Sequence, residues 1–277
     1  MKFRRSERLV DMTHYLMNHP RELISLSWFV QRYQSAKSSI SEDLVIINEM
    51  FKHQGIGILQ TVPGAAGGVK YFPMVKKEQA ADFVKVLCDL IADPDRLLPG
   101  GYLYMGDLLG DPKILHEVGK HLAAAVTDKN IDVIMTVATK GIPIAQAVST
   151  FLNVPFVIVR RDTKVTEGPT VTINYVSGST KRIQTMVLSK RSLKEGSNVL
   201  IVDDFMKAGG TIHGMVNLLE EFDASVAGIA VLVESEHVEE RLVDDYISLV
   251  KLTDVNTREK QINVVEGNYF SKVDHFL

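Results

Sequence analysis

The stretch VLIVDDFMKAGGT, residues 199–211, decides the fold of the larger part of this chain. It opens with four apolar residues, as a buried parallel strand does, and then reaches two adjacent acids, Asp203 and Asp204. A short turn with two glycines and a threonine follows the acids, and a helical pattern follows the turn. Because N–H groups at the start of a helix attract anions, the stretch predicts a strand, a phosphate-binding turn and a helix.

The residue types in this turn point to a sugar phosphate. Gly209 and Gly210 let the backbone approach an anion without a Cβ atom in the way, and the N–H groups of residues 208–211 can surround a phosphate together with the threonine hydroxyl. Asp203 and Asp204 are negative, so they suit ribose hydroxyls, or a Mg²⁺ ion whose other ligands are oxygens of the bound molecule. The stretch lacks the G-x-x-x-x-G-K-[ST] pattern of a P-loop. We therefore predict a ribose 5-phosphate site. The alternative is a purely structural role, in which an aspartate caps the helix and the glycines form a tight turn.

The sequence around this stretch alternates strands with helices. Such strands form parallel sheets that helices cover on both faces, so we expect an α/β fold. The segment 170–188 instead alternates around Ser177-Gly178-Ser179 and predicts a hairpin inserted into this layout. Runs rich in Val and Ile predict the strands at 131–137, 155–160, 198–202 and 225–233, with helices from about 142 and 210.

A second strand end, VATKGIP at residues 137–143, also leads into a turn with polar side chains. Thr139, Lys140 and Gly141 connect this strand to the helix that follows. Ligands of open α/β sheets bind beyond the carboxyl ends of the strands, so we expect this turn to belong to the same site as the paired acids.

The first 74 residues have a different pattern. Three groups of apolar residues at helical spacing predict three helices, with Ser25 as the cap of the second, and with Ser39 and Glu42 as a capping box at the start of the third. The stretch GIGILQTVPGAAGGVKYFP, residues 55–73, predicts a β-hairpin. Three helices and a hairpin resemble a winged helix-turn-helix, so we expect a winged-helix domain at 1–74 and an α/β domain at 75–277.

A winged helix places the start of its third helix against base edges in the major groove of double-stranded DNA. Residues 1–74 contain nine Lys or Arg against six Asp or Glu, whereas the remainder is acidic, so the first domain suits a polyanion. The alternative is a protein-docking module with a solvated charged face. The predicted DNA contacts are Lys37, Ser38, Ser39 and Ser41 in the third helix, Lys70 in the hairpin, and Lys2, Arg4, Arg5 and Arg8 near the start.

The composition narrows the class of protein further. Hydrophobic residues make up 45% and charged residues 23% of the 277 residues, as in ordinary globular proteins. Cys88 is the single cysteine, which suits a reducing cytoplasm, and no apolar run approaches the roughly 20 residues that cross a bilayer. His116 and His121 have no third ligand nearby, so we expect ordinary core or surface histidines rather than metal ligands.

VLIVDDFMKAGGT resembles the phosphoribosyl pyrophosphate (PRPP) binding motif of type I phosphoribosyltransferases, and ATKGIP resembles their pyrophosphate loop. The resemblance covers roughly residues 75–277, and residues 160–188 correspond to the flexible loop or hairpin of those enzymes. A winged helix in front of such a domain is similar to the arrangement of the bacterial purine operon repressor family. The resemblance implies a repressor of purine biosynthesis genes that binds their control regions on DNA and senses PRPP as inducer, with Mg²⁺ as a further ligand.

The resemblance also assigns roles within the site. Asp203 and Asp204 would contact the ribose hydroxyls, Lys207–Thr211 the 5-phosphate, and the backbone of Ala138–Gly141 the pyrophosphate. Tyr102 would either stack on a base or pack in the core. Arg160, Arg161 and Lys164 follow a strand end and would either reach the pyrophosphate or form a solvated basic patch. The predicted PRPP contacts are Ala138, Thr139, Lys140, Gly141, Asp203, Asp204, Phe205, Lys207, Ala208, Gly209, Gly210 and Thr211, with Tyr102, Arg160, Arg161 and Lys164 as further candidates.

Two positions favour sensing over catalysis. Lys207 stands where some purine enzymes of the family have an aspartate that manages a proton on the base, and Ala208 replaces their usual threonine. A fixed cation strengthens binding of the polyanion without favouring a cationic transition state, so we predict a non-catalytic PRPP sensor. The alternative is an active purine phosphoribosyltransferase with a regulatory or docking N-terminal domain. We also expect a homodimer, and competition from nucleotides that present a diphosphate to Thr139 and Lys140.

Overall fold

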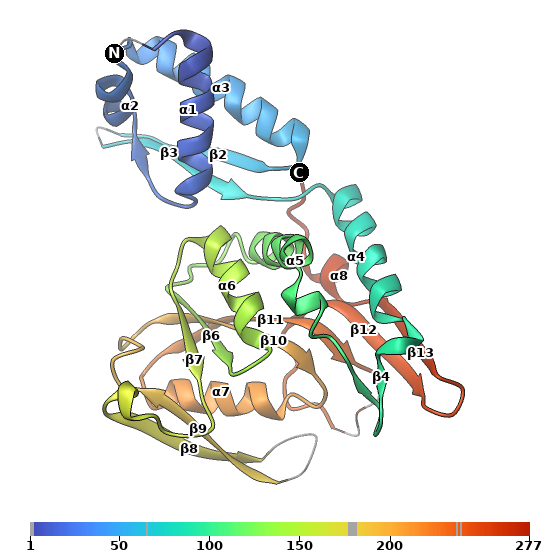
Figure 1. Ribbon diagram of the computed structural model, residues 1–277. Helices are drawn as coiled ribbons and strands as arrows, with labels where there is room; N and C mark the ends of the chain where they lie inside the picture. Colours follow the sequence, from blue (N-terminus) through green and yellow to red (C-terminus); the bar gives the residue numbers. More distant parts are fainter. Residues whose placement is uncertain (1–2, 65, 177–181, 237, 239) are drawn as a thin grey trace.

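The computed structural model describes residues 3–64, 66–176, 182–236, 238 and 240–277. Figure 1 shows a small part at the top and a larger part below it, joined by the segment that leads into α4 (Lys77–Ile91). We use "head" for the residues up to Met74 and "body" for those that follow. The head contains α1 (Arg5–Asn18), β1 (Ile24–Ser25), α2 (Leu26–Tyr33), α3 (Lys37–Gln54), β2 (Gly57–Val62) and β3 (Gly68–Pro73).

The head is the winged-helix arrangement expected from the sequence. Its strands form a small sheet in the order β1-β3-β2, in which β2 and β3 make the predicted hairpin. Ser25 caps α2 as predicted, because its Oγ accepts a hydrogen bond from the Trp28 N–H at 3.2 Å. The predicted capping box of α3 is wrong. The Ala36 carbonyl already accepts from the Ile40 N–H at 3.1 Å, so the helix begins at Lys37, before Ser39.

The body is built on a sheet of six strands in the order β13-β12-β11-β10-β6-β7. The pairs within β12-β11-β10-β6-β7 are parallel, and β13 is antiparallel to β12 at the edge, so the predicted parallel α/β sheet is confirmed. No helix within the described ranges combines the length and the apolar character of a membrane span. The remaining body elements are β4 (Leu97–Leu98), β5 (Tyr102–Leu103), α5 (Pro112–Ala125), β6 (Val133–Val137), α6 (Gly141–Leu152), β7 (Phe156–Val159), β8 (Thr170–Val176), β9 (Ile183–Ser189), β10 (Asn198–Met206), α7 (Gly210–Glu220), β11 (Ser225–Ser235), β12 (Ile247–Asn256), β13 (Gln261–Glu266) and α8 (Tyr269–Lys272).

Helices cover both faces of this sheet, as the sequence predicts. In Figure 1, α5 and α6 lie on the face toward the head, and α7 lies on the opposite face together with the hairpin of β8 and β9. Side chains alternate along the central strand β10: Leu200 and Val202 belong to the cluster under α5 and α6, and Val199 and Ile201 belong to the cluster under α7. The hairpin is the one predicted at 170–188, although its expected tip, Ser177-Gly178-Ser179, lies outside the described residues.

The order of the strands creates a place for a ligand. From β6 the chain passes through α6 to β7 on one side, and from β10 it passes through α7 to β11 on the other side. The two crossings diverge beyond the carboxyl ends of β6 and β10, which are neighbours in the sheet. Such a switch point leaves a crevice at the strand ends, so the two turns singled out in the sequence lie next to each other.

Head and body contact each other through a few polar groups. The Arg21 guanidinium lies over the Phe72 ring in the head and donates through Nη2 to the Lys129 carbonyl in the body at 2.7 Å. A second bond joins the two parts, because Lys76 Nζ in the body donates to the His53 carbonyl in the head at 2.7 Å. The head is therefore tied to the body by hydrogen bonds rather than by a shared apolar core.

His121 is a core histidine, as expected. Its ring stacks on Phe83 with centroids 4.7 Å apart, and its Nδ1 lies 2.7 Å from the Glu117 carbonyl. Burial lowers the pKa of His121 from 6.5 to about 4. The imidazole is thus neutral in the folded protein at a pH where it is protonated in the unfolded chain.

This depressed pKa predicts an acid-sensitive fold. The unfolded chain takes up a proton near pH 6.5 and the folded protein near pH 4, so the free energy of unfolding should fall across that window. The loss attributable to His121 should be about 3 kcal/mol, at 1.36 kcal/mol per pKa unit. Urea unfolding at pH 7 and pH 4.5 measures it, and His121→Gln should remove that part of the pH dependence. His213 is exposed, so His213→Gln should keep the pH dependence of wild type. The prediction would be contradicted if the free energy of unfolding fell equally between pH 7 and pH 4.5 in wild type and both variants.

Candidate functional site

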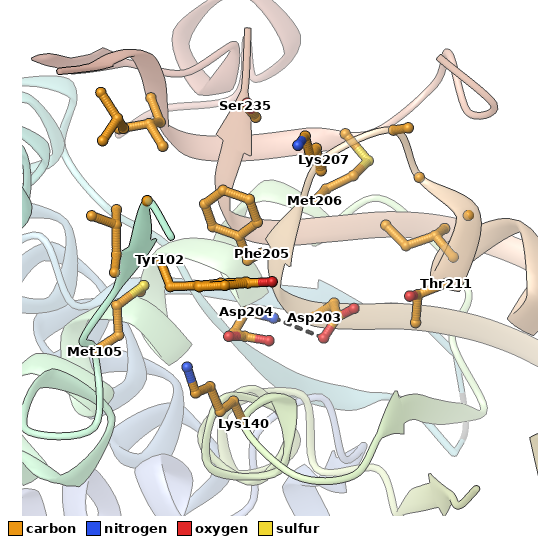
Figure 2. Close-up of a pocket in the computed structure, with 18 of the residues that line it drawn as sticks. Tyr102, Met105, Lys140, Asp203, Asp204, Phe205, Met206, Lys207, Thr211 and Ser235 are labelled. Carbon is orange, nitrogen blue, oxygen red and sulfur yellow. Dashed lines mark hydrogen bonds between the residues drawn. The ribbon is translucent and has the colours of Figure 1, made fainter. Parts of the chain in front are cut away.

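A cavity of about 540 Å³ lies at the carboxyl ends of the central strands, within the size range of small-molecule sites. Figure 2 shows it between the end of β10, the loop that opens α7, and the short strand β5. It brings together residues that are far apart in the sequence. The lining residues are Gly100, Gly101, Tyr102, Leu103, Met105, Lys140, Asp203–Ile212, Ser235 and Leu252–Val255.

The paired acids stand on β10 at the floor of this cavity. The Asp203 side chain is buried, and its Oδ1 accepts from the backbone N–H of Asp204 at 3.0 Å, the contact drawn in Figure 2. Burial and the neighbouring charge of Asp204 raise the pKa of Asp203, and burial raises the pKa of Asp204. Two desolvated carboxyl groups side by side favour hydroxyl donors or a cation, because either relieves the cost of their charge.

The glycine turn after the acids has the geometry of an anion site. Gly209 has φ +83°, in the left-handed region, and a Cβ atom there would lie 3.1 Å from the Val243 side chain. The helix α7 begins at Gly210, so the free N–H groups of its first turn lie at the cavity. Lys207 is exposed at the rim, where its charge adds to the attraction for an anion.

The turn after β6 packs directly against the acids. A Cβ atom on Gly141 would come within 2.1 Å of Thr136 Oγ1 and 3.2 Å of Asp203 Oδ1, so this position requires glycine. The peptide bond between Ala138 and Thr139 is cis. Within this turn, Lys140 lines the cavity, and its charge lowers the pKa of Asp204 against the effect of burial. The structure thus places both strand ends in one site.

Of the two alternatives that the sequence left open for Tyr102, the structure favours a place in the pocket. Tyr102 is 70% exposed and lines the cavity, so the alternative that it packs in the core is wrong. Figure 2 shows its ring between Phe205 and Asp204. Tyr102 stands on β5, which has two residues and pairs with the equally short β4. The lining residues Leu252–Val255, on β12, had no role in the sequence analysis. Ser235 ends β11 and does carry a signal, a polar residue at the end of an apolar strand.

The three basic residues after β7 do not line the cavity in the described structure. Arg160 Nε lies 3.2 Å from Glu167 Oε1, and Lys164 forms an ion pair with Asp162. Arg161 is exposed. Two of the three candidate side chains are therefore paired with acids of their own loop.

The predicted DNA contacts lie mostly on the surface of the head. Lys37, Ser38 and Ser41 are exposed in the first turns of α3, with Ser39 half-buried between them. Arg4 is exposed just before α1 and Arg5 is exposed in its first turn. Lys70 is half-buried on β3, and Lys2 lies outside the described residues.

Arg8 requires a correction. Its guanidinium is buried, with Nε 2.5 Å from Asp43 Oδ2 and Nη1 donating to Ser35 Oγ at 3.1 Å. Asp43 is 0% exposed and also accepts from Arg5 at 3.0 Å. Arg8 therefore joins α1 to α3 inside the head and does not point to a partner. The reason is a buried acid 35 residues away in the chain, which the local pattern around Arg8 does not show.

A metal ion at this site would depend on the ligand. Among the described residues, no three His, Cys, Asp or Glu side chains gather where they could hold one. Asp203 and Asp204 would supply carboxylate oxygens to Mg²⁺, whose octahedral shell would be completed by oxygens of a phosphorylated ligand and water.

Family models match both parts of the chain. A model described as bacterial purine repressor, N-terminal, matches residues 4–73, and one described as phosphoribosyl transferase domain matches residues 106–266. The first covers the helices and hairpin of the head, and the second covers the six-stranded sheet and the cavity-lining residues from Lys140 onward.

Individual relatives extend over nearly the whole chain. A protein of Bacillus subtilis (strain 168) named purine biosynthesis transcriptional repressor PurR is 64% identical over 269 residues, which are 97% of this chain and 94% of the relative. A protein of Lactococcus lactis subsp. lactis (strain IL1403) named purine biosynthesis transcriptional activator PurR is 50% identical over 97% of this chain and 99% of the relative. The crystal structure of adenine phosphoribosyltransferase from Thermoanaerobacter pseudethanolicus matches with a TM-score of 0.52 at 26% identity, over 60% of this chain and 98% of that chain.

Proposed function

The chain belongs to the bacterial purine repressor family, and from this premise we propose that it represses purine biosynthesis genes and releases their control regions when PRPP binds in the body. The observation that carries the proposal is that one chain combines a winged-helix head with a cavity in which the buried Asp203 and the half-buried Asp204 lie beside a helix N-terminus. We propose repression rather than activation because the more similar relative is named a repressor. We place the domain boundary near residue 74 and the protein in the cytoplasm.

Each end of PRPP has a matching part of the site in this proposal. Asp203 and Asp204 accept hydrogen bonds from the ribose hydroxyls, and the N–H groups of Lys207–Thr211 bind the 5-phosphate. The turn Ala138–Gly141 binds the pyrophosphate through its backbone, with Lys140 as a counter-charge. Mg²⁺ would neutralise the pyrophosphate and the acids together when it is bound.

We propose that the body senses PRPP without transferring its ribosyl group. Lys207 puts a cation at the rim where a developing positive charge on the sugar would be opposed. Both PurR relatives described above match nearly the whole chain and are named as transcriptional regulators, which supports this view. Incubation with PRPP, Mg²⁺ and each purine base should release no pyrophosphate in excess of the protein. Steady release would instead establish the alternative, an active phosphoribosyltransferase with a regulatory head.

We propose that the head reads DNA as part of a homodimer. Lys37, Ser38 and Ser41 at the start of α3 would face the bases, and Arg4 and Lys70 would contact phosphates. A second copy of the head doubles these contacts and matches a two-fold symmetric operator. PRPP must then bind the DNA-free state more tightly than the DNA-bound state. A coupling of about 1–3 kcal/mol would lower DNA affinity roughly 5- to 150-fold.

DNA retardation with and without PRPP tests the proposal. The protein should shift a fragment from a purine gene control region, and PRPP with Mg²⁺ should reverse the shift by a factor within that range. Ribose 5-phosphate and pyrophosphate, each alone, are the matched ligand controls. A complex that forms equally well at saturating PRPP would reject the role of PRPP as inducer.

The turn at Thr139 and Lys140 suggests a class of competitors. Any nucleotide that presents a diphosphate to this turn would occupy the same site, and it would block the response to PRPP without replacing its effect on DNA. Displacement of bound PRPP by nucleoside diphosphates tests this, and no displacement at millimolar concentrations would reject it.

A further inference from the structure

A buried acid stands behind the glycine turn and has no part in the site described so far. Glu234 is 3% exposed near the end of β11. Its carboxylate accepts from Tyr246 Oη at 2.5 Å, from Ser248 Oγ at 2.7 Å and from Arg241 Nη1 at 3.1 Å. We call these four side chains the Glu234 network. A buried carboxylate with this many donors holds its partners firmly, because each would otherwise leave an unsatisfied charge or dipole.

Arg241 connects this network to the chain that follows β11. Its Nη2 donates to the Ser235 carbonyl at 2.7 Å, and its guanidinium lies over the Tyr246 ring, 5.2 Å from the centroid. The side chain is therefore fixed from three directions. Residues next to Arg241 in the sequence are fixed with it.

Those neighbours contact the glycine turn from behind. The Leu242 N–H donates to the Ala208 carbonyl at 2.9 Å, and Val243 packs where a Cβ atom on Gly209 would lie. Leu242 and Val243 are absent from the lining residues of the described cavity, whereas Ala208 and Gly209 line it. The turn is thus held between the cavity on one side and the segment of Arg241 on the other.

The hydrogen bond from Leu242 to the Ala208 carbonyl also fixes the orientation of the next N–H group in the turn, that of Gly209. In a trans peptide, the C=O of one residue and the N–H of the next point in opposite directions. The carbonyl of Ala208 accepts from Leu242, which does not line the cavity, so the N–H of Gly209 is turned away from Leu242. The bond from Leu242 therefore orients a donor that the 5-phosphate would use.

We infer that Arg241 and Glu234 are positioning residues for the sugar phosphate, which act by holding Leu242 and Val243 against the turn 208–209. This inference rests on the proposed function. It predicts that loss of the network weakens binding at the 5-phosphate end of the site. The pyrophosphate end, on the turn Ala138–Gly141, contacts none of the four side chains through a described hydrogen bond and should be unaffected.

Calorimetry on the full chain with two separate ligands tests the inference. Ribose 5-phosphate and magnesium pyrophosphate are titrated into wild type, Arg241→Gln and the exposed control Arg191→Gln. Arg241→Gln should weaken ribose 5-phosphate at least tenfold and leave pyrophosphate within twofold, and Arg191→Gln should change neither. The ratio of the two dissociation constants, taken on one sample, does not depend on the folded fraction. An unchanged ratio in Arg241→Gln would overturn the inference.

A second, more conservative variant keeps the inference testable if Arg241→Gln does not fold. Tyr246→Phe removes one donor to Glu234 and keeps the ring. The dissociation constant of ribose 5-phosphate divided by that of magnesium pyrophosphate should therefore rise about two- to fivefold. If Arg241→Gln does not fold, the same ratio in Tyr246→Phe decides, and no change there rejects the inference. A wild-type protein that binds neither PRPP nor ribose 5-phosphate would reject the proposed function instead, so the two failures are distinguishable.

Discussion

The double variant Asp203→Ala/Asp204→Ala is expected to bind a purine gene control region as tightly as wild type and to ignore PRPP. The acids are on the body, at the carboxyl end of β10, and the predicted DNA contacts are on the head. Each hydrogen bond between a charged acceptor and a ligand hydroxyl contributes about 1.5–3 kcal/mol. Loss of both acids should therefore weaken PRPP by a factor on the order of 100 or more.

DNA retardation across a PRPP titration, together with calorimetry, measures both halves of this result. The matched control is Glu220→Ala/Glu221→Ala, which removes the same charge from exposed positions at the far end of α7. The control separates the loss of specific contacts from a general change in the charge of the body, which alone would alter the attraction to DNA. If the aspartate variant released DNA at the PRPP concentration that releases wild type, the acid pair would be misassigned.

The chemistry of the site was largely predictable because it is local in the sequence. A buried strand, two acids, two glycines and a helix start follow one another within residues 199–211, and each residue type has a direct physical reason. The same holds for the turn at 137–143. That the two turns meet follows from parallel strands whose ends lie on one edge, a rule of sheet topology rather than of any residue.

The parts that the sequence did not reveal depend on contacts across the chain. The local pattern around Arg8 is that of an exposed basic residue, and its buried partner Asp43 lies 35 residues away in the chain. The Glu234 network joins residues from three segments, and nothing in the order of its residues marks the acid as buried. Local periodicity predicts the elements, whereas the start of α3 and the partners of the charged groups depend on contacts that it does not show.

Asp43→Ala is expected to produce the opposite phenotype to the aspartate pair: loss of DNA binding with normal affinity for PRPP. Asp43 is the fully buried partner of Arg8 and also accepts from Arg5, so it joins α1 to α3. Its removal leaves the Arg8 guanidinium buried without a counter-charge, which costs about 3–5 kcal/mol. A small domain with a total stability of about 5–15 kcal/mol would lose much of it. DNA affinity should fall at least a hundredfold, because α3 is then no longer held.

The neighbouring acid provides the control for this variant. Glu42 is exposed and lies 3.6 Å from Arg5, so Glu42→Ala should cost less than about 1 kcal/mol and keep DNA binding. Thermal unfolding, DNA retardation and PRPP calorimetry on the full chain separate the head from the body. Asp43→Ala protein that binds DNA like wild type would show that this ion pair does not hold the head together.

A second substitution then decides the role of Arg8. Replacing both partners of a buried ion pair by apolar residues of similar size is often neutral or stabilising, so Arg8→Met/Asp43→Leu should regain the stability that Asp43→Ala loses. Because Arg8 is buried against Asp43 and Ser35, the repaired head should also regain DNA affinity to within about tenfold of wild type. Recovered stability without recovered DNA binding would instead return Arg8 to the set of DNA contacts. The burial of its guanidinium in the DNA-free protein would then have to change when DNA binds.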